Sequence, residues 1–389
     1  MRRWAALLAC AALAACAGIP ADPPVVLATA GPPLDGATVA KPWYYELPAE
    51  DPASSGGSVE QFWSMVGRED RAASFADDEY RARPCRGPGP VARNVDETLE
   101  FVAARARETR IVIVNESHHV TRHRDFTARL AERLKPEGYR VFAAETFLNV
   151  DGEPDPVDAH GTPWPTMDLG HYSAEPVFGR MLRRVTAAGY RLAAYEEVHD
   201  DAAFRTQNRY NRVTARESAQ AKNLAAILAG MDPGEKLLVH AGYAHASEEV
   251  TRDEEDREIA YMAARLARQT GIDPLTIDQT TCRGGSADDV LLHATPQGEN
   301  APFDLVVDHP VVRFVHGRAA WRFADGYLPT PVPPPYDRAP EPLVIEVFRE
   351  GEPFDAVPDD RLYVEPGEDA MLVLRPGRYT VRAIRPVRP

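Results

Sequence analysis

The sequence lacks several motifs that would identify a common class of protein directly. It contains no Gly-x-Ser-x-Gly nucleophile motif, no Walker-type glycine loop and no Cys-x-x-Cys-His haem-attachment motif. These absences argue against a serine hydrolase of the α/β-hydrolase type, a P-loop nucleotide-binding protein and a covalently bound haem. After the N-terminal region there is also no run of about 20 apolar residues, so we expect no transmembrane helix.

Positive charge is scarce relative to negative charge. The chain has 44 Lys and Arg residues against 59 Asp and Glu residues, which gives a formal net charge of -15. This balance argues against nucleic acid or an anionic lipid surface as the main partner. Hydrophobic residues make up 44% of the sequence, which is enough to form a sizeable core. We therefore expect a folded, acidic protein.

The N-terminus has the pattern of a secretory signal. Arg2 and Arg3 precede a short run of Ala and Leu that is too short to cross a bilayer. Residues 13–16, Leu-Ala-Ala-Cys, resemble a lipobox, so we expect residues 1–15 to be removed and Cys16 to carry lipid. Because Ala17 follows it and not an acidic residue, we favour the outer membrane, with the protein facing the periplasm. An ordinary cleavage site beside a chance cysteine is the alternative.

Only four cysteines occur, and two of them lie in this N-terminal segment. Once Cys10 leaves with the signal peptide and Cys16 carries lipid, Cys85 and Cys282 remain. In an oxidising compartment two remaining cysteines are most simply explained as a disulfide, which would tie together the two ends of the core domain. Two unrelated buried thiols are the alternative, because the sequence does not show whether these residues approach each other.

Composition divides the chain into five parts. Residues 16–58 are rich in Pro, Ala and Gly, which is typical of a tether, and residues 328–342 form a second Pro-rich stretch that we interpret as a linker. Between them, residues 59–327 form the expected core domain. After the linker, residues 343–389 contain β-rich runs separated by Gly and Pro turns, which predict a small all-β module.

The core domain alternates short apolar runs with helical patterns. This alternation predicts βαβ units and an α/β fold with a mainly parallel sheet flanked by helices. The expected strands are 111–114, 140–144, 191–195 and 236–241, with further strands at 275–278 and 305–307. The expected helices are 122–135, 177–187, 214–229 and 255–269.

Ionisable residues follow four of these strands at the point where each strand ends. In an open parallel sheet, ligands bind beyond the carboxyl ends of the strands, so these side chains should gather at one edge. Each taken alone is also explained as a solvated loop residue or as a helix-terminal charge. The residues are Glu116, His118, His119 and His123 after the first strand, Glu145 after the second, Glu196, Glu197 and His199 after the third, and His245 after the fourth.

Four motifs occur in an order that resembles a known superfamily. They are residues 112–119 (Val-Ile-Val-Asn-Glu-Ser-His-His), 143–145 (Ala-Ala-Glu), 216–224 (Arg-Glu-Ser-Ala-Gln-Ala-Lys-Asn-Leu) and 238–245 (Leu-Val-His-Ala-Gly-Tyr-Ala-His). Together they resemble the group that contains erythromycin esterase-like proteins, TIKI-like proteins and ChaN-type haem-binding uptake lipoproteins. The resemblance spans about residues 102–248. Asn115 stands where the family usually has Gly, and both neighbouring histidines fit the family spacing.

The esterase branch of this resemblance implies hydrolysis without a metal. His118 or His119 would act as the general base, since a carboxylate-flanked imidazole can remove a proton from water near neutral pH. Glu116 or Glu145 would orient that imidazole, and Arg216 would stabilise the developing negative charge. A small molecule or a peptide would be the substrate.

The TIKI-like branch implies instead a divalent metal ion that activates water as a Lewis acid. Carboxylate oxygens and imidazole nitrogens are suitable ligands for such an ion. The candidate ligands are Glu116, His118, His119, Glu145 and His245.

The ChaN-type branch implies capture of haem or of a metal ion without turnover. Any haem would be bound non-covalently, with a His or Tyr as axial ligand. Tyr243, Tyr195 and His171 are the candidates. A non-catalytic envelope protein is the third alternative, although unpaired ionisable groups clustered at one edge would be costly to bury in an inert protein.

Overall fold

The computed structural model describes residues 24–48, 59–149, 163–198, 208–295 and 301–387. The predicted signal peptide and the predicted lipidation site, Cys16, lie outside these ranges, as does His199. No helix in the described part of the chain is both long and apolar enough to cross a membrane.

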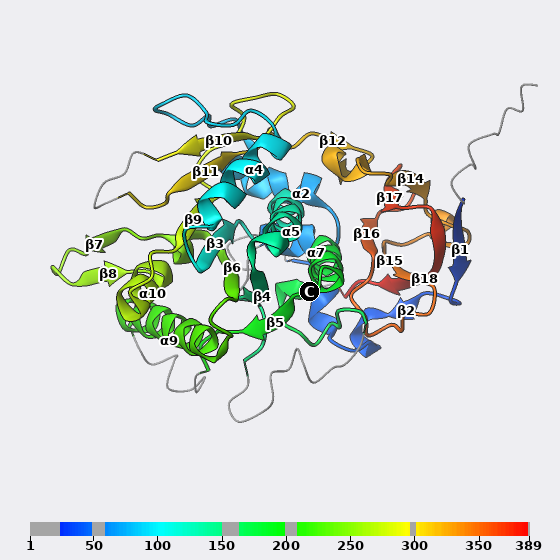
Figure 1. Ribbon diagram of the computed structural model, residues 1–389. Helices are drawn as coiled ribbons and strands as arrows, with labels where there is room; N and C mark the ends of the chain where they lie inside the picture. Colours follow the sequence, from blue (N-terminus) through cyan, green and yellow to red (C-terminus); the bar gives the residue numbers. More distant parts are fainter. Residues whose placement is uncertain (1–23, 49–58, 150–162, 199–207, 296–300, 388–389) are drawn as a thin grey trace, which may run out of the picture.

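A seven-stranded sheet forms the centre of the core domain (Figure 1). Its strand order is β10-β11-β9-β3-β6-β4-β5, and every neighbouring pair is parallel except β10 with β11. The predicted α/β fold with a mainly parallel sheet is therefore confirmed. The strands are β3 (Ile111–Glu116), β4 (Tyr139–Ala144), β5 (Arg191–Ala194), β6 (Lys236–Gly242), β9 (Leu275–Asp278), β10 (Leu291–Ala294) and β11 (Leu305–Asp308).

Helices cover both faces of this sheet (Figure 1). Successive residues of a strand point to opposite faces, so Val112 packs in the same cluster as Leu130 while Ile113 packs with Leu224. Both faces of β3 are apolar for this reason, which is the usual composition of a buried parallel strand. One face carries α4 (Val95–Ala106), α5 (Arg122–Leu134) and α7 (Pro176–Ala187), and the other carries α9 (Arg209–Gly230) and α10 (Met262–Thr270).

The predicted helix 255–269 begins later than the sequence pattern suggested. Its first residues belong to an antiparallel hairpin of β7 (Val250–Arg252) and β8 (Glu258–Ala260). The turn between them is stabilised by Asp253, whose Oδ1 accepts hydrogen bonds from the backbone N–H groups of residues 255 and 257. An aspartate that bonds the backbone two residues ahead favours a turn over a helix.

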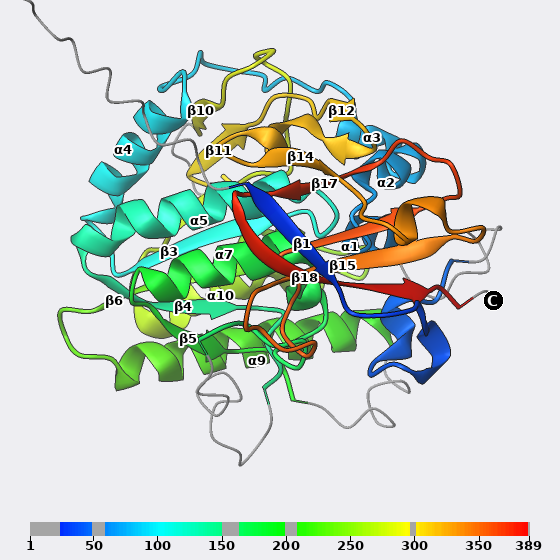
Figure 2. The same cartoon turned by 90° about the vertical axis from the view of Figure 1, so that its right-hand side faces the viewer.

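The C-terminal β module includes residues from the N-terminal region (Figure 2). Strand β1 (Val25–Thr29) lies within the predicted tether, yet it pairs in parallel with β18 from Val25 opposite Gly377 to Thr29 opposite Val381. Residues of the predicted linker likewise form β14, which pairs with β17. The structure therefore differs from a simple tether and linker in both segments. The strands of the module are β1, β2 (Leu34–Asp35), β14 (Leu328–Pro331), β15 (Leu343–Arg349), β16 (Asp360–Val364), β17 (Met371–Leu374) and β18 (Gly377–Arg385).

The β module packs against the core domain through buried charge. Arg361 is completely buried. Its Nε donates to Glu346 within the module, and its Nη1 donates to the carbonyls of Met65 and Ala174 in the core domain. Three short helices, α1 (Val59–Met65), α2 (Glu69–Phe75) and α3 (Asp77–Tyr80), precede the central sheet. The all-β appendage that the sequence predicts is therefore present, but it is closely joined to the α/β core.

Cys85 and Cys282 form the predicted disulfide, with their Cα atoms 5.1 Å apart. Backbone hydrogen bonds between Arg83 and Arg283, two bonds of 2.8 and 2.9 Å, align the two segments beside it. The bond links the loop before α4 to the loop after β9, at a sequence separation of 197 residues.

Candidate functional site

Three adjacent strands deliver the candidate residues to one edge of the sheet. Because β6 lies between β3 and β4, the end of β3 at Glu116, the end of β6 at Gly242 and the residue after β4, Glu145, are neighbours. The backbone N–H of Gly242 donates to Oε2 of Glu145 at 2.5 Å. The predicted gathering of strand-end residues beyond a parallel sheet is therefore what the geometry shows.

Glu116 is completely buried and is held by a guanidinium group. Arg124 donates from Nε to Oε2 and from Nη2 to Oε1, each at 2.8 Å, and Nε2 of His240 lies 3.2 Å from Oε2. Burial opposes the charged form, but attraction to Arg124 and His240 outweighs it and holds the pKa of Glu116 well below its usual value. Glu116 is therefore an ionised carboxylate inside the protein.

One ring nitrogen of His118, Nδ1, contacts the carboxylate of Glu116, and the other, Nε2, faces the site. Its Nδ1 is 3.0 Å from Oε1 of Glu116, so Nδ1 carries the proton when the ring is neutral. The ring packs at 4.2 Å from Tyr172 and at 5.1 Å from Tyr243, measured between centroids. The side chain keeps 19% of its exposure, so solvent reaches the ring.

Gly242 makes this arrangement possible by having no side chain. A Cβ at position 242 would lie 2.6 Å from Nε2 of His118 and 3.0 Å from Oε2 of Glu145. Both distances are shorter than normal van der Waals contact, so any larger residue would push the imidazole or the carboxylate away. The glycine of the fourth motif is thus explained by close approach and not by an unusual backbone conformation.

Glu145 and Arg216 form the second half of the site. Arg216 binds Oε1 of Glu145 through Nη2 and Glu196 through Nε and Nη2, and its Nη1 lies 3.0 Å from Nε2 of His245. Burial opposes ionisation of Glu145, but His245 and Arg216 lower its pKa to about 2. The pair of carboxylates keeps the guanidinium fixed at the edge of the sheet.

His245 is clamped between two carboxylates. Its Nδ1 lies 2.7 Å from Oε1 of Glu217, and its Nε2 lies 3.4 Å from Oε1 of Glu145. Burial disfavours the charged imidazole, but Glu145 and Glu217 together raise the pKa of His245 above its usual value. The ring therefore carries positive charge over a wider pH range than a free histidine.

Of the two adjacent histidines, only His118 belongs to this site. The ring of His119 turns away to α3, where its Nε2 lies 3.1 Å from Oε2 of Glu79. His123 is buried and accepts a hydrogen bond from the backbone N–H of Ser117 at 3.1 Å. Burial lowers the pKa of His123 to about 3, so this ring is neutral and structural.

Asn115, near the carboxyl end of β3, braces the edge of the sheet. Its side-chain amide donates to Asp278 at 2.7 Å and to the carbonyl of Tyr243 at 2.9 Å, and its oxygen accepts from the backbone of Gln279 at 2.7 Å. Tyr243 sits at a positive φ of 44°, which is rare for a residue with a side chain. Asn115 thus ties β3 to β9 and to the strained residue after β6.

The three predicted axial ligands for haem do not converge. Tyr195 is completely buried, and its hydroxyl donates to the carbonyl of His240 at 2.9 Å. His171 stacks on Tyr44, with ring centroids 6.0 Å apart. Only Tyr243 is both exposed and in contact with the site, since its ring meets that of His118 edge to face.

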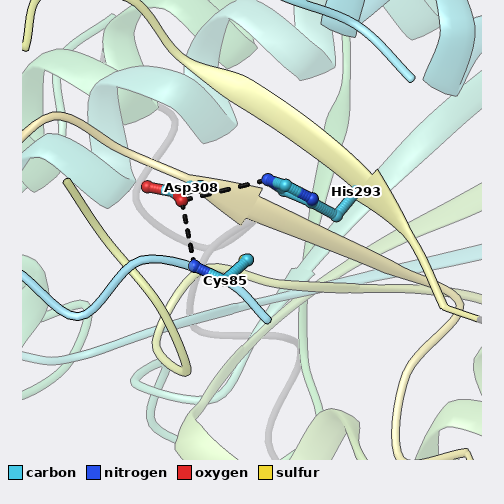
Figure 3. Close-up of side chains that lie close together, drawn as sticks. All are labelled: Cys85, His293 and Asp308. Atoms are coloured by element: carbon cyan, nitrogen blue, oxygen red, sulfur yellow. Dashed lines mark hydrogen bonds and ion pairs between the residues drawn. The ribbon is translucent and has the colours of Figure 1, made fainter. Parts of the chain in front are cut away.

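The five predicted metal ligands do not form a single ligand set either. Arg124 occupies both oxygens of Glu116, and His119 faces α3. A closer grouping of ligand types within the described residues is Cys85, His293 and Asp308, whose ligand atoms lie within 4.8 Å of one another (Figure 3). Because Cys85 is bonded to Cys282, its sulfur is not a thiolate ligand while the disulfide is intact.

Sequence analysis did not identify several residues that complete the site. Arg124 and His240 hold Glu116, while Glu217 holds His245 and Gln220 supports Glu196. Arg124 and Glu217 lie within helices, where the pattern gives charged residues no special meaning. A signal was present in the motif 216–224, because Gln220 lies one helical turn from both Arg216 and Glu217.

Comparisons with known proteins find only distant structural similarity. No protein-family model and no curated protein matches the chain. Similar solved structures include the MARTX toxin effector domain RRSP from Vibrio vulnificus, with 15% identity, 65% of this chain and 46% of that chain covered and a TM-score of 0.34. They also include the type III effector HopBA1, with 15% identity and a TM-score of 0.33. That match covers 60% of this chain and 97% of the HopBA1 chain.

A third similar structure is ChaN of Campylobacter jejuni, described with cofacial haem, at 10% identity with 54% of this chain and 91% of that chain covered and a TM-score of 0.36. This chain spans less than half the length of the toxin chains that it matches first. At these identities and TM-scores, the likeness assigns no activity to the protein.

Proposed function

We propose that the protein is a hydrolase in which His118 acts as a general base on water. The observation that carries this proposal is the Glu116–His118 pair, with Nδ1 of the imidazole 3.0 Å from a carboxylate oxygen that is held ionised by Arg124. A carboxylate in this position fixes the tautomer, leaves Nε2 free to accept a proton and stabilises the imidazolium that forms. The resemblance to the erythromycin esterase-like group supports the same assignment.

The proposed reaction is hydrolysis of an ester or an amide. His118 takes one proton of a water molecule on Nε2 while the water oxygen bonds to the carbonyl carbon. The negative charge that develops on the carbonyl oxygen is stabilised by Arg216, the guanidinium group beside His245 at the same edge. The bond to the leaving group then breaks, and the imidazolium of His118 returns the proton to that group.

Fixed carboxylates support the proposed role of Arg216. Glu145 and Glu196 hold its guanidinium in one orientation, so little reorganisation is needed when charge appears on the substrate. Nη1 of Arg216 contacts a ring nitrogen of His245 and no carboxylate of the described residues, so its second N–H is the one that we assign to the oxyanion. Tyr172 and Tyr243 flank the base and restrict the path of the substrate.

The test compares two adjacent histidines. The full-length protein and the variants His118→Asn and His119→Asn are assayed on chromogenic acyl esters and on a peptide library. We expect His118→Asn to lower kcat/KM by about 10²- to 10⁴-fold. His119→Asn should change it by less than about tenfold, because His119 does not face the site.

Equal losses in both variants, or hydrolysis that survives His118→Asn, would overturn the proposal. No hydrolysis of any probe, together with a Soret band on adding haem that is lost in Tyr243→Phe, would favour haem binding instead. Tyr243 is the residue for this control because it is the one predicted axial ligand that is exposed at the site.

We further propose that a lipid on Cys16 holds this hydrolase in the cell envelope, facing the periplasm. The lipobox-like residues 13–16 support this location. Metabolic labelling with an alkyne fatty acid should label the full-length protein in the membrane fraction. The variant Cys16→Ser should lose the label, and labelling that persists in it would exclude this anchor.

A further inference from the structure

A large cavity lies against α5 and α7, and its lining contains none of the catalytic residues proposed above. It encloses about 1150 Å³ and is lined by α5, α7, the loops at residues 287–290 and 309–313, the segment 320–327, and two arginines of the β module. None of Glu116, His118, Glu145, Arg216 and His245 lines it. The helix α7 lies between the central sheet and the β module, so the cavity is at the junction of the two (Figure 1).

Arginines outnumber carboxylates in the lining of this cavity, although the protein as a whole is acidic. Nine arginines line it against four carboxylates, although the chain carries a formal net charge of -15. Seven of these arginines form ion pairs with carboxylates in or behind the lining, whereas no ion pair joins Arg122 or Arg375 to a described carboxylate. A concentration of positive charge in a concave, partly desolvated region strengthens attraction to anions, since low-dielectric walls focus the field. An acidic protein has no general need for such a region.

Arg122 is the residue for which this charge is least compensated. Among the described residues, no hydrogen bond or ion pair joins its guanidinium to a carboxylate, whereas its neighbours Arg129 and Arg184 both bind Asp125. Burial lowers the pKa of Arg122. The negative charge of Asp125 opposes this effect, and the positive charges of Arg129 and Arg313 lower the pKa further. Burying a cation without a partner is costly, so a bound anion would complete this environment.

A second uncompensated cation lies across the cavity. Arg375 is exposed and packs its guanidinium 4.7 Å above the ring of Tyr327, whose other contact is with Arg180 at 4.2 Å. Among the described residues, Arg375 makes no ion pair. Tyr327 thus holds one guanidinium group from the β module, that of Arg375, and one from α7, that of Arg180, in the lining of the cavity.

We propose that this cavity is a binding site for a polyvalent anion that carries phosphate or carboxylate groups. Guanidinium groups bind both by paired hydrogen bonds, and several arginines around one space favour a ligand with more than one negative charge. Met181 and Trp321 also line the cavity and provide an apolar wall for an organic portion of the ligand. The site is separate from the proposed hydrolytic centre.

The test is calorimetric titration of the full-length protein with inorganic pyrophosphate and, separately, with citrate. We expect one or both to bind, with an affinity that falls as salt is raised because the contacts are between charges. Stronger binding of pyrophosphate would identify phosphate as the preferred group, and stronger binding of citrate would identify carboxylate. No binding of either anion would overturn the proposal.

Two variants and a control locate the binding. Arg122→Gln and Arg375→Gln should each weaken binding by about tenfold or more, as expected for loss of a charge-assisted hydrogen bond. The control is Arg378→Gln, because Arg378 is exposed, pairs with Glu350 and lies outside the cavity. Equal affinity in the two cavity variants and the control would overturn the location.

A melting measurement without ligand separates this role from a structural one. Arg122→Gln should leave the melting temperature unchanged or raise it, because the substitution removes a partly buried cation that no described carboxylate binds. A large fall would instead mark Arg122 as part of the core packing. Arg375→Gln keeps the binding test independent of folding, since Arg375 is exposed.

Discussion

Arg124 and Glu116 form an ion pair through two hydrogen bonds, and both side chains are completely buried. The remaining nitrogen of Arg124, Nη1, donates to Glu175 at 2.9 Å, and Nη2 also donates to the carbonyl of His118 at 2.8 Å. The same guanidinium therefore fixes the carboxylate, the backbone of the proposed base and the first turn of α7. The electrostatics of the site and the packing of the core cannot be separated at this point.

Replacing Glu116 should for this reason destabilise the fold. Glu116→Gln leaves the buried Arg124 with only Glu175 as a charged partner, and breaking a buried pair typically costs about 3–5 kcal/mol. Urea denaturation measures the free energy of unfolding. The control is Glu350→Gln, an exchange in an exposed surface pair with Arg378, which should leave stability unchanged. Equal stability of the two variants would show that the pair is not part of the core.

Gly242→Ala should impair the proposed chemistry with little change elsewhere. The added methyl group would lie 2.4 Å from Cε1 of His118, so the ring must move. A displacement of about 1 Å in a positioned group can cost about 10²-fold in rate. Gly230→Ala is the matched control, because a Cβ there meets nothing within 4 Å. Full activity in Gly242→Ala would mean that His118 is not the base.

The raised pKa of His245 predicts a pH-dependent contribution to stability. A histidine with a higher pKa in the folded protein stabilises it fully below the unfolded value of 6.5, and this stabilisation is lost as pH rises through the folded value. His245→Gln should thus cost more free energy of unfolding at about pH 6 than at about pH 9. Chemical denaturation at both pH values tests this difference. A cost that is larger at the higher pH would reverse the assigned direction.

The disulfide should make a large contribution to stability because it closes a long loop. Replacing both Cys85 and Cys282 by Ser is expected to lower the free energy of unfolding by about 2–5 kcal/mol, since their separation is 197 residues. Reductant should lower the melting temperature of the wild-type protein and leave that of the double variant unchanged. If the wild-type protein melts at the same temperature with and without reductant, the bond does not stabilise the fold.

The sequence was most informative where local pattern and sheet geometry agree. Glu116 and Glu145 could be assigned to one edge because each follows a short, wholly apolar run, and parallel strands end on the same side. The side chains of His118 and His119 could not be distinguished, because adjacent residues in a loop have no fixed periodicity. The structure separates them through Glu79, which comes from a helix far away in the sequence.

Long-range pairing is the part that the sequence could not specify. Val25–Thr29 reads as part of a Pro- and Ala-rich segment, and nothing local indicates that its partner is β18. In the sequence, Arg124 is one of several charged residues of an amphipathic helix. Its burial depends on the strand packed beneath it, which the local pattern does not show. Packing against distant residues overrides local pattern in both cases.

The position of β1 beside β18 has a consequence for biogenesis. The strand that is made among the first residues of the domain has its hydrogen-bonding partner among the last, at residues 377–381. The central α/β sheet, whose last strand ends at residue 308, can form before residues 377–381 pair with β1. The edge of the β module therefore closes late, and until then β1 is an unpaired strand available to chaperones and proteases.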